Sequence, residues 1–205
     1  MAKVTLTTFL SLDGVMQAPG GPNEDTSGGF ELGGWLVPYV DEDMERTMAE
    51  VFDRAAGFVL GRRTYEIFAG YWPRVTDQGN VIASRLNNLP KYVASTTLAR
   101  AEWHNSTLIS DAAHAVRKLK GDLDGELQIH GSGRLAQSLL AHDLIDELLL
   151  LVYPVVLGTG KRLFAEESVP TAFRLLDSRT TGTGVAVHRY AFAGRPTVGS
   201  FELAD

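Results

Sequence analysis

Three short segments place glycine, hydroxyl or arginine residues where a β-strand is expected to give way to a helix or a loop. They follow an apolar run at 57–61, a strand expected at 91–95 and a strand expected at 126–130. Their residues are Gly61, Arg62, Arg63 and Thr64, then Ser95 and Thr96, then Gly131, Ser132, Gly133 and Arg134. Backbone N–H groups at a helix N-terminus and guanidinium groups both bind phosphate oxygens. The three segments therefore predict phosphate binding.

The third segment continues to Ala136 and reads G-x-G-x-x-A between an expected strand and an expected helix. Such glycines let a phosphate group approach the backbone closely. A complete dinucleotide-binding fingerprint also has an acidic residue at the end of the next strand, whereas here that strand ends at Tyr153 and Pro154. An ordinary Rossmann domain is therefore disfavoured. Glycines that only tighten the turn, and two arginines that are simply solvated, remain the alternatives.

Hydrophobic patterns predict the elements that position these segments. Strands are expected at 3–10, 57–61, 91–95, 106–109, 126–130, 144–153, 172–180 and 184–193. Helices are expected after Asp41, with an apolar face that runs from Met44 to Ala55, then from Arg62 or Arg63, over about 77–88, after Asp111, and from the glycine turn to about His142. The run 144–153 is almost entirely apolar, which predicts burial on both faces.

This alternation predicts an α/β fold with a mainly parallel central sheet, helices on both faces and an antiparallel C-terminal β-hairpin at one edge. The carboxyl ends of parallel strands open onto one crevice. The three segments are therefore expected to meet there and to bind one extended, phosphate-bearing ligand.

Composition excludes several classes of function. The chain has 205 residues, no cysteine and a net charge of −6. The acidity disfavours a nucleic-acid surface, and no apolar run is long enough to cross a bilayer. The lack of cysteine excludes thiolate chemistry, and the five histidines show no metal-ligand spacing, so no metal site is predicted. We expect one cytoplasmic domain over residues 1–205.

The segment 11–40 is long, irregular and rich in glycine and proline. Loops of this length inside compact domains are usually lids or binding loops, and a disordered insertion is the alternative. The aromatic residues Phe30 and Trp35 favour a functional loop, because a solvated loop does not need them. Trp35 is the residue we expect to stack on a flat heterocycle, and a place in the hydrophobic core is the alternative.

These motifs resemble a known family. Residues 60–66 (LGRRTYE), 92–95 (YVAS) and 130–134 (HGSGR) are similar to the three NADPH-binding segments of the dihydrofolate reductase fold, in order and spacing. The stretches 131–140, 144–148, 157–160 and 163–164, with 11–14 (SLDG), resemble more closely the reductase domain of the bifunctional riboflavin-biosynthesis deaminase/reductase. The resemblance covers most of 1–193. It implies a dihydrofolate-reductase-like fold, bound NADPH and often a homodimer.

The resemblance implies hydride transfer to a pyrimidine- or pterin-like substrate. Asp13 and an acid of the first helix are the candidates for handling a proton or hydrogen-bonding the substrate, because reduction of an imine needs a proton as well as a hydride. A turn-forming Asp13 and a solvated helix acid are the alternatives. Glu45 is nearest the position of the pterin-binding acid, and Glu42 is its rival. The chain departs from the riboflavin reductases at Val15, where they usually carry a basic residue, and it lacks the deaminase half.

We therefore expect an NADPH-dependent reductase that resembles 5-amino-6-(5-phosphoribosylamino)uracil reductase. Dihydrofolate reductase activity and non-catalytic binding of a nucleotide or pterin are the alternatives. A preference for NADPH over NADH would depend on Arg62 or Arg63, because the 2′-phosphate requires cationic donors. The apolar strand at 144–153 and the terminal strands suggest a homodimer, and coverage of the strand by helices alone is the alternative.

Overall fold

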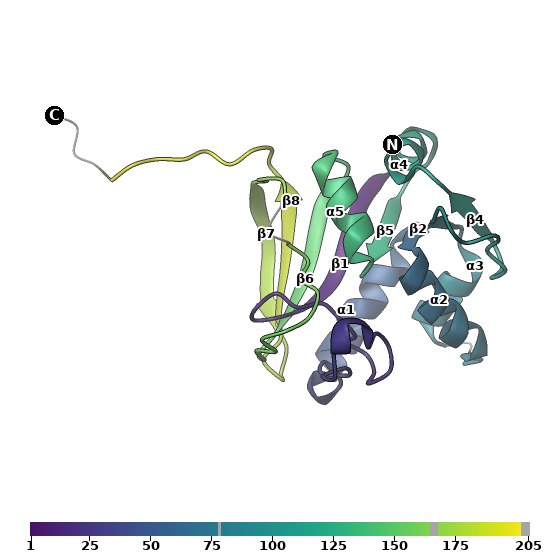
Figure 1. The fold of residues 1–205 in the computed structure, drawn as a ribbon, viewed down its shortest axis with the longest axis horizontal. Coiled ribbons are helices and arrows are strands. Elements are labelled where there is room, and N and C mark those ends of the chain that lie inside the picture. The colour runs from purple at the N-terminus through teal and green to yellow at the C-terminus, as the bar shows by residue number, and fades with distance from the viewer. Residues whose placement is uncertain (78, 165–167, 202–205) are drawn as a thin grey trace.

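A computed structural model describes residues 1–77, 79–164 and 168–201. In this part of the chain eight strands form one sheet in the order β4-β3-β2-β5-β1-β6-β8-β7 (Figure 1). The strands are β1 (Lys3–Ser11), β2 (Ala55–Gly61), β3 (Lys91–Ala94), β4 (Ser106–Ile109), β5 (Glu126–His130), β6 (Glu147–Tyr153), β7 (Phe173–Thr180) and β8 (Ala186–Phe192). The helices are α1 (Glu42–Asp53), α2 (Arg62–Tyr71), α3 (Val81–Asn88), α4 (Ala112–Asp122) and α5 (Gly133–Ala141).

The first six strands pair in parallel, while β8 pairs antiparallel with β6 and β7 antiparallel with β8. This confirms the α/β class, the mainly parallel sheet and the antiparallel C-terminal hairpin at one edge. Strand β1 lies centrally, between β5 and β6 (Figure 1). Its carboxyl end therefore lies beside the turns that follow its neighbours.

Two apolar clusters pack on the two faces of the sheet. One contains side chains from α1, α2 and α3, including Met48, Phe52, Tyr65 and Leu86. The other contains side chains from α4 and α5, including Val116 and Leu139, against Leu6 and Ile129 of the sheet. Helices thus cover both faces, as the alternation of elements predicts.

The helices begin in two different ways. Asp41, Asn80 and Asp111 each accept a hydrogen bond from a backbone amide in the first turn of α1, α3 and α4. Helices α2 and α5 follow Gly61 and Ser132, and neither has a side-chain cap within the described residues. Their first N–H groups are therefore left without a side-chain partner at the carboxyl edge of the sheet.

Three expected boundaries are wrong. Helix α1 ends at Asp53, and Ala55 begins β2 rather than completing the helix face. Helix α3 begins at Val81 and not near 77, because Asn80 caps it. Strand β6 begins at Glu147, since Asp146 turns its carboxylate back to the amide of Val4 (2.8 Å).

The expected burial of β6 on both faces is also wrong. Leu148, Leu151 and Tyr153 are buried, while the residues between them are only half-buried. Because β8 and β7 extend the sheet beyond β6 without a helix of their own in the described chain, part of this apolar strand stays accessible (Figure 1).

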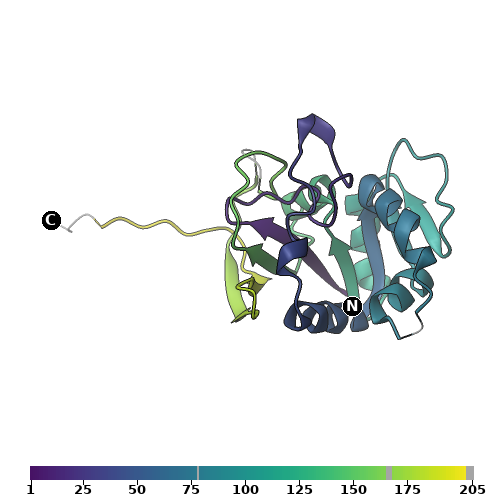
Figure 2. The ribbon, with the colours of Figure 1, turned by 90° about the horizontal axis from the view of Figure 1, so that it is seen from below.

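The segment 11–40 is packed onto the molecule, so the alternative of a disordered insertion is wrong. Phe30, Trp35 and Leu36 are buried in the α1-side cluster. The Trp35 indole Nε1 donates to the carbonyl of Gln17 (2.8 Å). The loop begins at the carboxyl end of β1 and lies at the lower end of that strand in Figure 1, and Figure 2 shows it from below.

Candidate functional site

The turns after β2 and β5 lie against each other. The Gly61 amide donates to Ser132 Oγ (3.0 Å), and a Cβ at Gly61 would lie 3.4 Å from that of Ser132. Gly131 has φ +53° and Ser132 φ +52°, a left-handed conformation that glycine adopts readily. Thr64 turns toward Gly131, since a Cβ there would lie 3.7 Å from Thr64 Oγ1. The first and third predicted segments thus form one surface.

This surface carries the uncapped N-termini of α2 and α5. A helix N-terminus has partial positive charge and free N–H groups, so it favours an anion. Gly133 is the first residue of α5, and a Cβ there would lie 2.9 Å from Met16 Sδ. Arg134 is exposed beside it, without a hydrogen bond or ion pair among the described residues.

The second segment joins the surface through Arg62. The Arg62 guanidinium donates to Thr97 Oγ1 (2.8 Å) and to Glu66 Oε1 (2.8 Å). Ser95 Oγ accepts hydrogen bonds from the amides of Thr97 and Leu98, which shapes the loop after β3, and Thr96 is exposed beside it. All three predicted segments therefore meet at the carboxyl edge of β3, β2 and β5.

Arg63 turns away from Arg62 toward the long loop. It donates to the Asp25 carboxylate and to Ser27 Oγ (2.9 Å). Lys161 Nζ, from the turn after β6, donates to the same two groups at 2.6 Å each. Burial alone would raise the pKa of Asp25, yet the hydrogen bonds from Lys161, Ser27 and Arg63 hold it well below its ordinary value.

Asp25 and Lys161 were not among the predicted site residues. Asp25 is one polar residue among many in an irregular loop, and Lys161 is far from Arg63 in the chain. The glycines at 158 and 160 mark a turn at Lys161, but they give no sign of its partner. Only the three-dimensional fold brings these residues together.

Asp13 anchors the turn that follows β6. Its carboxylate accepts hydrogen bonds from the Leu157 amide (3.0 Å), Ser11 Oγ (2.7 Å), the Gly158 amide (2.9 Å) and Arg162 (3.2 Å). These donors, the Leu157 amide foremost, hold the pKa of Asp13 far below its usual value despite some burial. Such a carboxylate stays ionised at neutral pH, so its hydrogen bonds favour a structural role. The predicted proton transfer by Asp13 gains no support from them.

The acids of α1 do not face the sheet. Glu45 and Glu42 are exposed, while the inward face of the helix carries Met44, Thr47 and Met48. Every residue of α1 is described, and no carboxylate in it is buried. The helix period of 3.6 explains this, because Glu45 follows the buried Met44 by one position, or about 100° around the axis. The predicted role of Glu45 in binding a substrate therefore has no geometric support.

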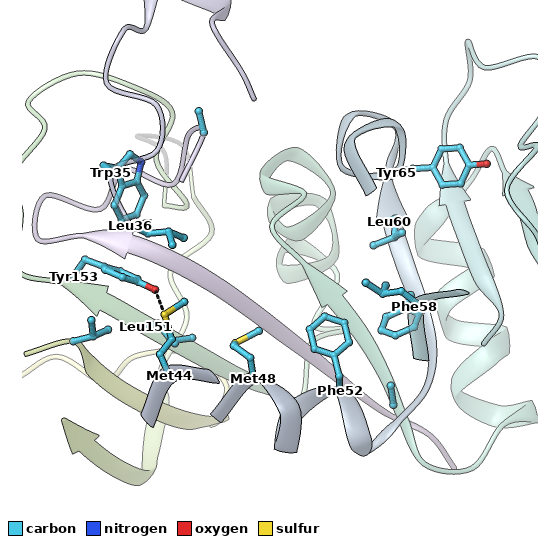
Figure 3. Packing of buried hydrophobic residues seen from close by; sticks show 14 of the residues in the cluster. Trp35, Leu36, Met44, Met48, Phe52, Phe58, Leu60, Tyr65, Leu151 and Tyr153 are labelled. Atoms are coloured by element: carbon cyan, nitrogen blue, oxygen red, sulfur yellow. Dashed lines mark hydrogen bonds between the residues drawn. The ribbon is translucent and has the colours of Figure 1, made fainter. Parts of the chain in front are cut away.

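Trp35 packs in the core, where it makes an edge contact with Tyr153 at 5.3 Å between ring centroids (Figure 3). Phe9 and Tyr39 also contact Tyr153, and its hydroxyl donates to Met44 Sδ (3.1 Å). Trp35 is only 7% exposed. It anchors the loop in this conformation, and stacking on a ligand stays a prediction that would require the ring to be uncovered.

His130, just before the glycine turn, is buried and stacks on Phe52 with ring centroids 4.3 Å apart. Gln128 Nε2 donates to the Val51 carbonyl, so Gln128 Oε1 is left to accept from His130 Nε2 (3.1 Å). Burial lowers the pKa of His130 to about 3, so the ring is neutral. It serves the packing of α1 against β5.

A family model described as the RibD C-terminal domain matches residues 2–187. The chain belongs to this family. Its relatives include the uncharacterized protein YwjB of Bacillus subtilis (strain 168), 26% identical over 91% of this chain and 96% of YwjB. The family match confirms the resemblance to the riboflavin-biosynthesis reductase domain, which rests on 131–140, 144–148, 157–160, 163–164 and 11–14.

Solved structures show that the fold is dihydrofolate-reductase-like. A putative riboflavin biosynthesis protein from Shewanella sp. PV-4 has a TM-score of 0.72 and 23% identity, covering 94% of this chain and 99% of that one. Dihydrofolate reductase of Schistosoma mansoni has a TM-score of 0.59 and 13% identity, with 94% and 99% covered. In the described part of the chain, no helix is long and apolar enough to cross a membrane.

Proposed function

We propose that this protein is an NADPH-dependent reductase that transfers a hydride to a pyrimidine- or pterin-like heterocycle, as 5-amino-6-(5-phosphoribosylamino)uracil reductase does. Membership of the RibD C-terminal domain family supports a reductase of the riboflavin-pathway type. The observation that carries the cofactor assignment is the pair of uncapped helices α2 and α5, whose glycine turns contact each other through Gly61 and Ser132.

The residues present fit a dinucleotide. The free amides at the N-termini of α2 and α5 would bind its diphosphate. Arg62 reaches to Thr97 and lies beside the loop of Ser95 and Thr96, so this group suits a further phosphate on the ribose. Cationic and hydroxyl donors are what the 2′-phosphate of NADPH requires, whereas NAD sites usually place a carboxylate on the ribose.

When bound, a nicotinamide cofactor supplies the hydride, and the protein contributes binding, orientation and exclusion of water. Here the long loop is tied to the turn at 155–162 by Asp13, and to α2 through Arg63 and Asp25. The loop can therefore shield the crevice from water. In the described residues no buried carboxylate of α1 faces the crevice, so the proton that accompanies the hydride comes from elsewhere, with solvent as the simplest source.

The test is titration of NADPH and NADH at fixed low salt, because exposed phosphate contacts are screened by ions. Arg62→Ala should weaken NADPH binding about 10- to 150-fold and spare NADH, since a charge-assisted contact contributes about 1.5–3 kcal/mol. Arg85→Ala is the matched control, because Arg85 is also an exposed helix arginine paired with an acid, Asp53. Equal affinity of the unaltered protein for both cofactors would refute the NADPH assignment.

Binding of a nucleotide without turnover is a second candidate. It is favoured by the exposure of Glu45 and by the ionised state of Asp13, which leave the crevice without an evident proton donor. Loss of NADPH absorbance with pyrimidine and pterin substrates would decide for the reductase. The same exposure of Glu45 disfavours dihydrofolate reduction, and antifolate binding would test that alternative.

A homodimer in the cytoplasm completes the proposal. The accessible apolar positions of β6 and the exposed Leu175 of the edge strand β7 lie in the part of the sheet that β6, β8 and β7 form, where a two-fold pairing would cover them. Light scattering at micromolar concentration tests the pairing. A monomer would remove it without affecting the cofactor assignment.

A further inference from the structure

Three separate segments meet around the carboxylate of Asp25. Arg63 comes from the first turn of α2, Lys161 from the turn after β6, and Ser27 from the long loop. Both cations donate to Asp25 and to Ser27 Oγ, and Ser27 Oγ donates in turn to Asp25 Oδ1 (2.5 Å). Two cations thus converge on one monoanion, which leaves the cluster with an excess of positive charge.

Exposure within this cluster is uneven. The side chain of Asp25 is only 10% exposed, whereas those of Arg63 and Lys161 are 55% and 52% exposed. The carboxylate lies inside and the cations remain open to solvent. An anion arriving from solvent would therefore meet the cations directly, and the uncapped amides of α2 lie next to Arg63.

We infer that Arg63, Lys161 and Ser27 form a binding site for a phosphate group, which the side chain of Asp25 fills until a phosphate-bearing ligand displaces it. A phosphate dianion offers more charge and more acceptor oxygens than a carboxylate, and guanidinium and ammonium groups bind both. Because Asp25 competes for the same donors, the site discriminates against weak monoanions. This site is independent of hydride transfer and would serve any ligand that carries a phosphate or diphosphate.

The site does not depend on the Asp25 side chain for its shape. Gln17 is 4% exposed, and its Nε2 donates to the backbone carbonyls of Asp25 (3.0 Å) and Ser27 (2.8 Å). Gln17 Oε1 accepts from the Lys161 amide (3.0 Å). One buried amide side chain therefore holds the loop and the Lys161 turn together through their backbones. Replacing the Asp25 carboxylate should leave the three donors in place.

The test compares Asp25→Asn with the unaltered protein by calorimetric titration of inorganic pyrophosphate, ribose 5-phosphate and NADPH at low salt. We expect at least one of the three to bind about tenfold more tightly to the variant, because a competing charge has been removed. Asp53→Asn is the matched control, since it removes the same charge from another aspartate–arginine pair and should change no affinity. Adding Arg63→Ala to Asp25→Asn should abolish the gain.

The three ligands separate the possible sources of the phosphate. A gain for pyrophosphate and NADPH alone assigns the site to the diphosphate of a dinucleotide, and a gain for ribose 5-phosphate alone assigns it to a phosphorylated substrate. Unchanged or weaker binding of all three would overturn the inference, because Asp25 would then only fasten the loop. Should Asp25→Asn fail to fold, the ¹³C carboxyl signal of Asp25 in the unaltered protein must shift on addition of one of the three ligands, and an unshifted signal overturns it equally. Neither readout depends on turnover, so a failure of the proposed reductase function would be seen separately.

Discussion

The two faces of the central strands are built from different residues. Toward α4 and α5, strands β1 and β5 present mostly apolar side chains, among them Val4, Leu6, Leu127 and Ile129, and the buried Thr8 is the exception. Toward α1 the same strands present mostly polar ones, which include Thr5, Thr7, Glu126, Gln128 and His130, all buried, with Phe9 as an apolar exception. Successive residues of a strand point to opposite faces, so a single alternating sequence produces both surfaces.

The two faces are therefore stabilised in different ways. The apolar face depends on the area it buries and tolerates any well-packed arrangement of similar volume. The polar face must satisfy each buried group, because an unpaired one costs about 1–3 kcal/mol. Gln128 meets this requirement by donating to the Val51 carbonyl at 2.6 Å, which fixes the register of α1 on β5. The packing of the polar face toward α1, which also supports the long loop, is therefore the more strictly determined.

The largest effect should come from the apolar face. Ile129→Ala should lower the free energy of unfolding by about 2–5 kcal/mol, because Ile129 is fully buried and its removal leaves a cavity. Urea denaturation measures this. Thr107→Ala on the exposed side of β4 is the control and should change stability by no more than about 0.5 kcal/mol. A loss below 1 kcal/mol at Ile129 would show that this face repacks freely.

The polar face should make the free energy of unfolding depend on pH. Burial lowers the pKa of His130 to about 3 in the folded protein, against an ordinary value of 6.5. Below pH 6.5 His130 binds a proton in the unfolded chain but stays neutral in the folded protein. His130 therefore does not reduce the free energy of unfolding above pH 6.5, and this free energy falls as the pH falls below that value. The slope should be about 1.4 kcal/mol per pH unit, or about 2–3 kcal/mol between pH 6.5 and 4.5.

Urea denaturation at several pH values measures that slope, and His130→Phe should abolish it while keeping the stacking on Phe52. The window stops at pH 4.5 because Asp13 and Asp25, whose pKa values are depressed, add their own loss of stability at lower pH. If His130→Phe kept the slope above pH 4.5, the slope would come from a group other than His130.

The smallest effect concerns Thr5, whose buried hydroxyl finds no hydrogen-bond partner among the described residues. Thr5→Val should raise the free energy of unfolding by up to about 1 kcal/mol, since it removes an unpaired polar group and keeps the branched shape. Thr47→Val is the matched control with the opposite sign, because Thr47 Oγ1 donates to the Asp43 carbonyl and accepts from Arg179. A lower free energy of unfolding in Thr5→Val would show that the Thr5 hydroxyl is hydrogen-bonded to a water in the adjoining cavity of about 20 Å³.

The sequence predicts the fold well wherever local chemistry determines it. Asp41 and Asp111 mark helix starts because their carboxylates cap the following amides, and both predictions are confirmed. The predicted start of β6 is wrong because Asp146 accepts a hydrogen bond from the amide of Val4, which is far away in the chain. Ala55 was assigned to the helix since its apolar character suits either a helix face or a buried strand.

In the candidate site, too, only features that depend on residues adjacent in the sequence could be predicted. The glycine turns at Gly61 and Gly131 could be placed because strand, glycine and helix are adjacent in the sequence. The orientation of Glu45 depends on the rotation of α1 about its axis, where a shift of one residue changes the direction of a side chain by about 100°. The cluster of Asp25 and Lys161 depends on the path of an irregular loop, for which no periodicity exists.

The central place of β1 has a consequence for synthesis on the ribosome. Its partners are β5 and β6, so Lys3 pairs with Glu126 and Thr5 with Glu147. Chains emerge at roughly 5–20 residues per second, so β1 waits on the order of ten seconds for β5 and β6. During that time Val4, Leu6 and Leu10 lack the sheet that will bury them. Such distant pairings also slow refolding of the complete chain. Newly made β1 is therefore a segment that a chaperone would protect until β5 and β6 have followed.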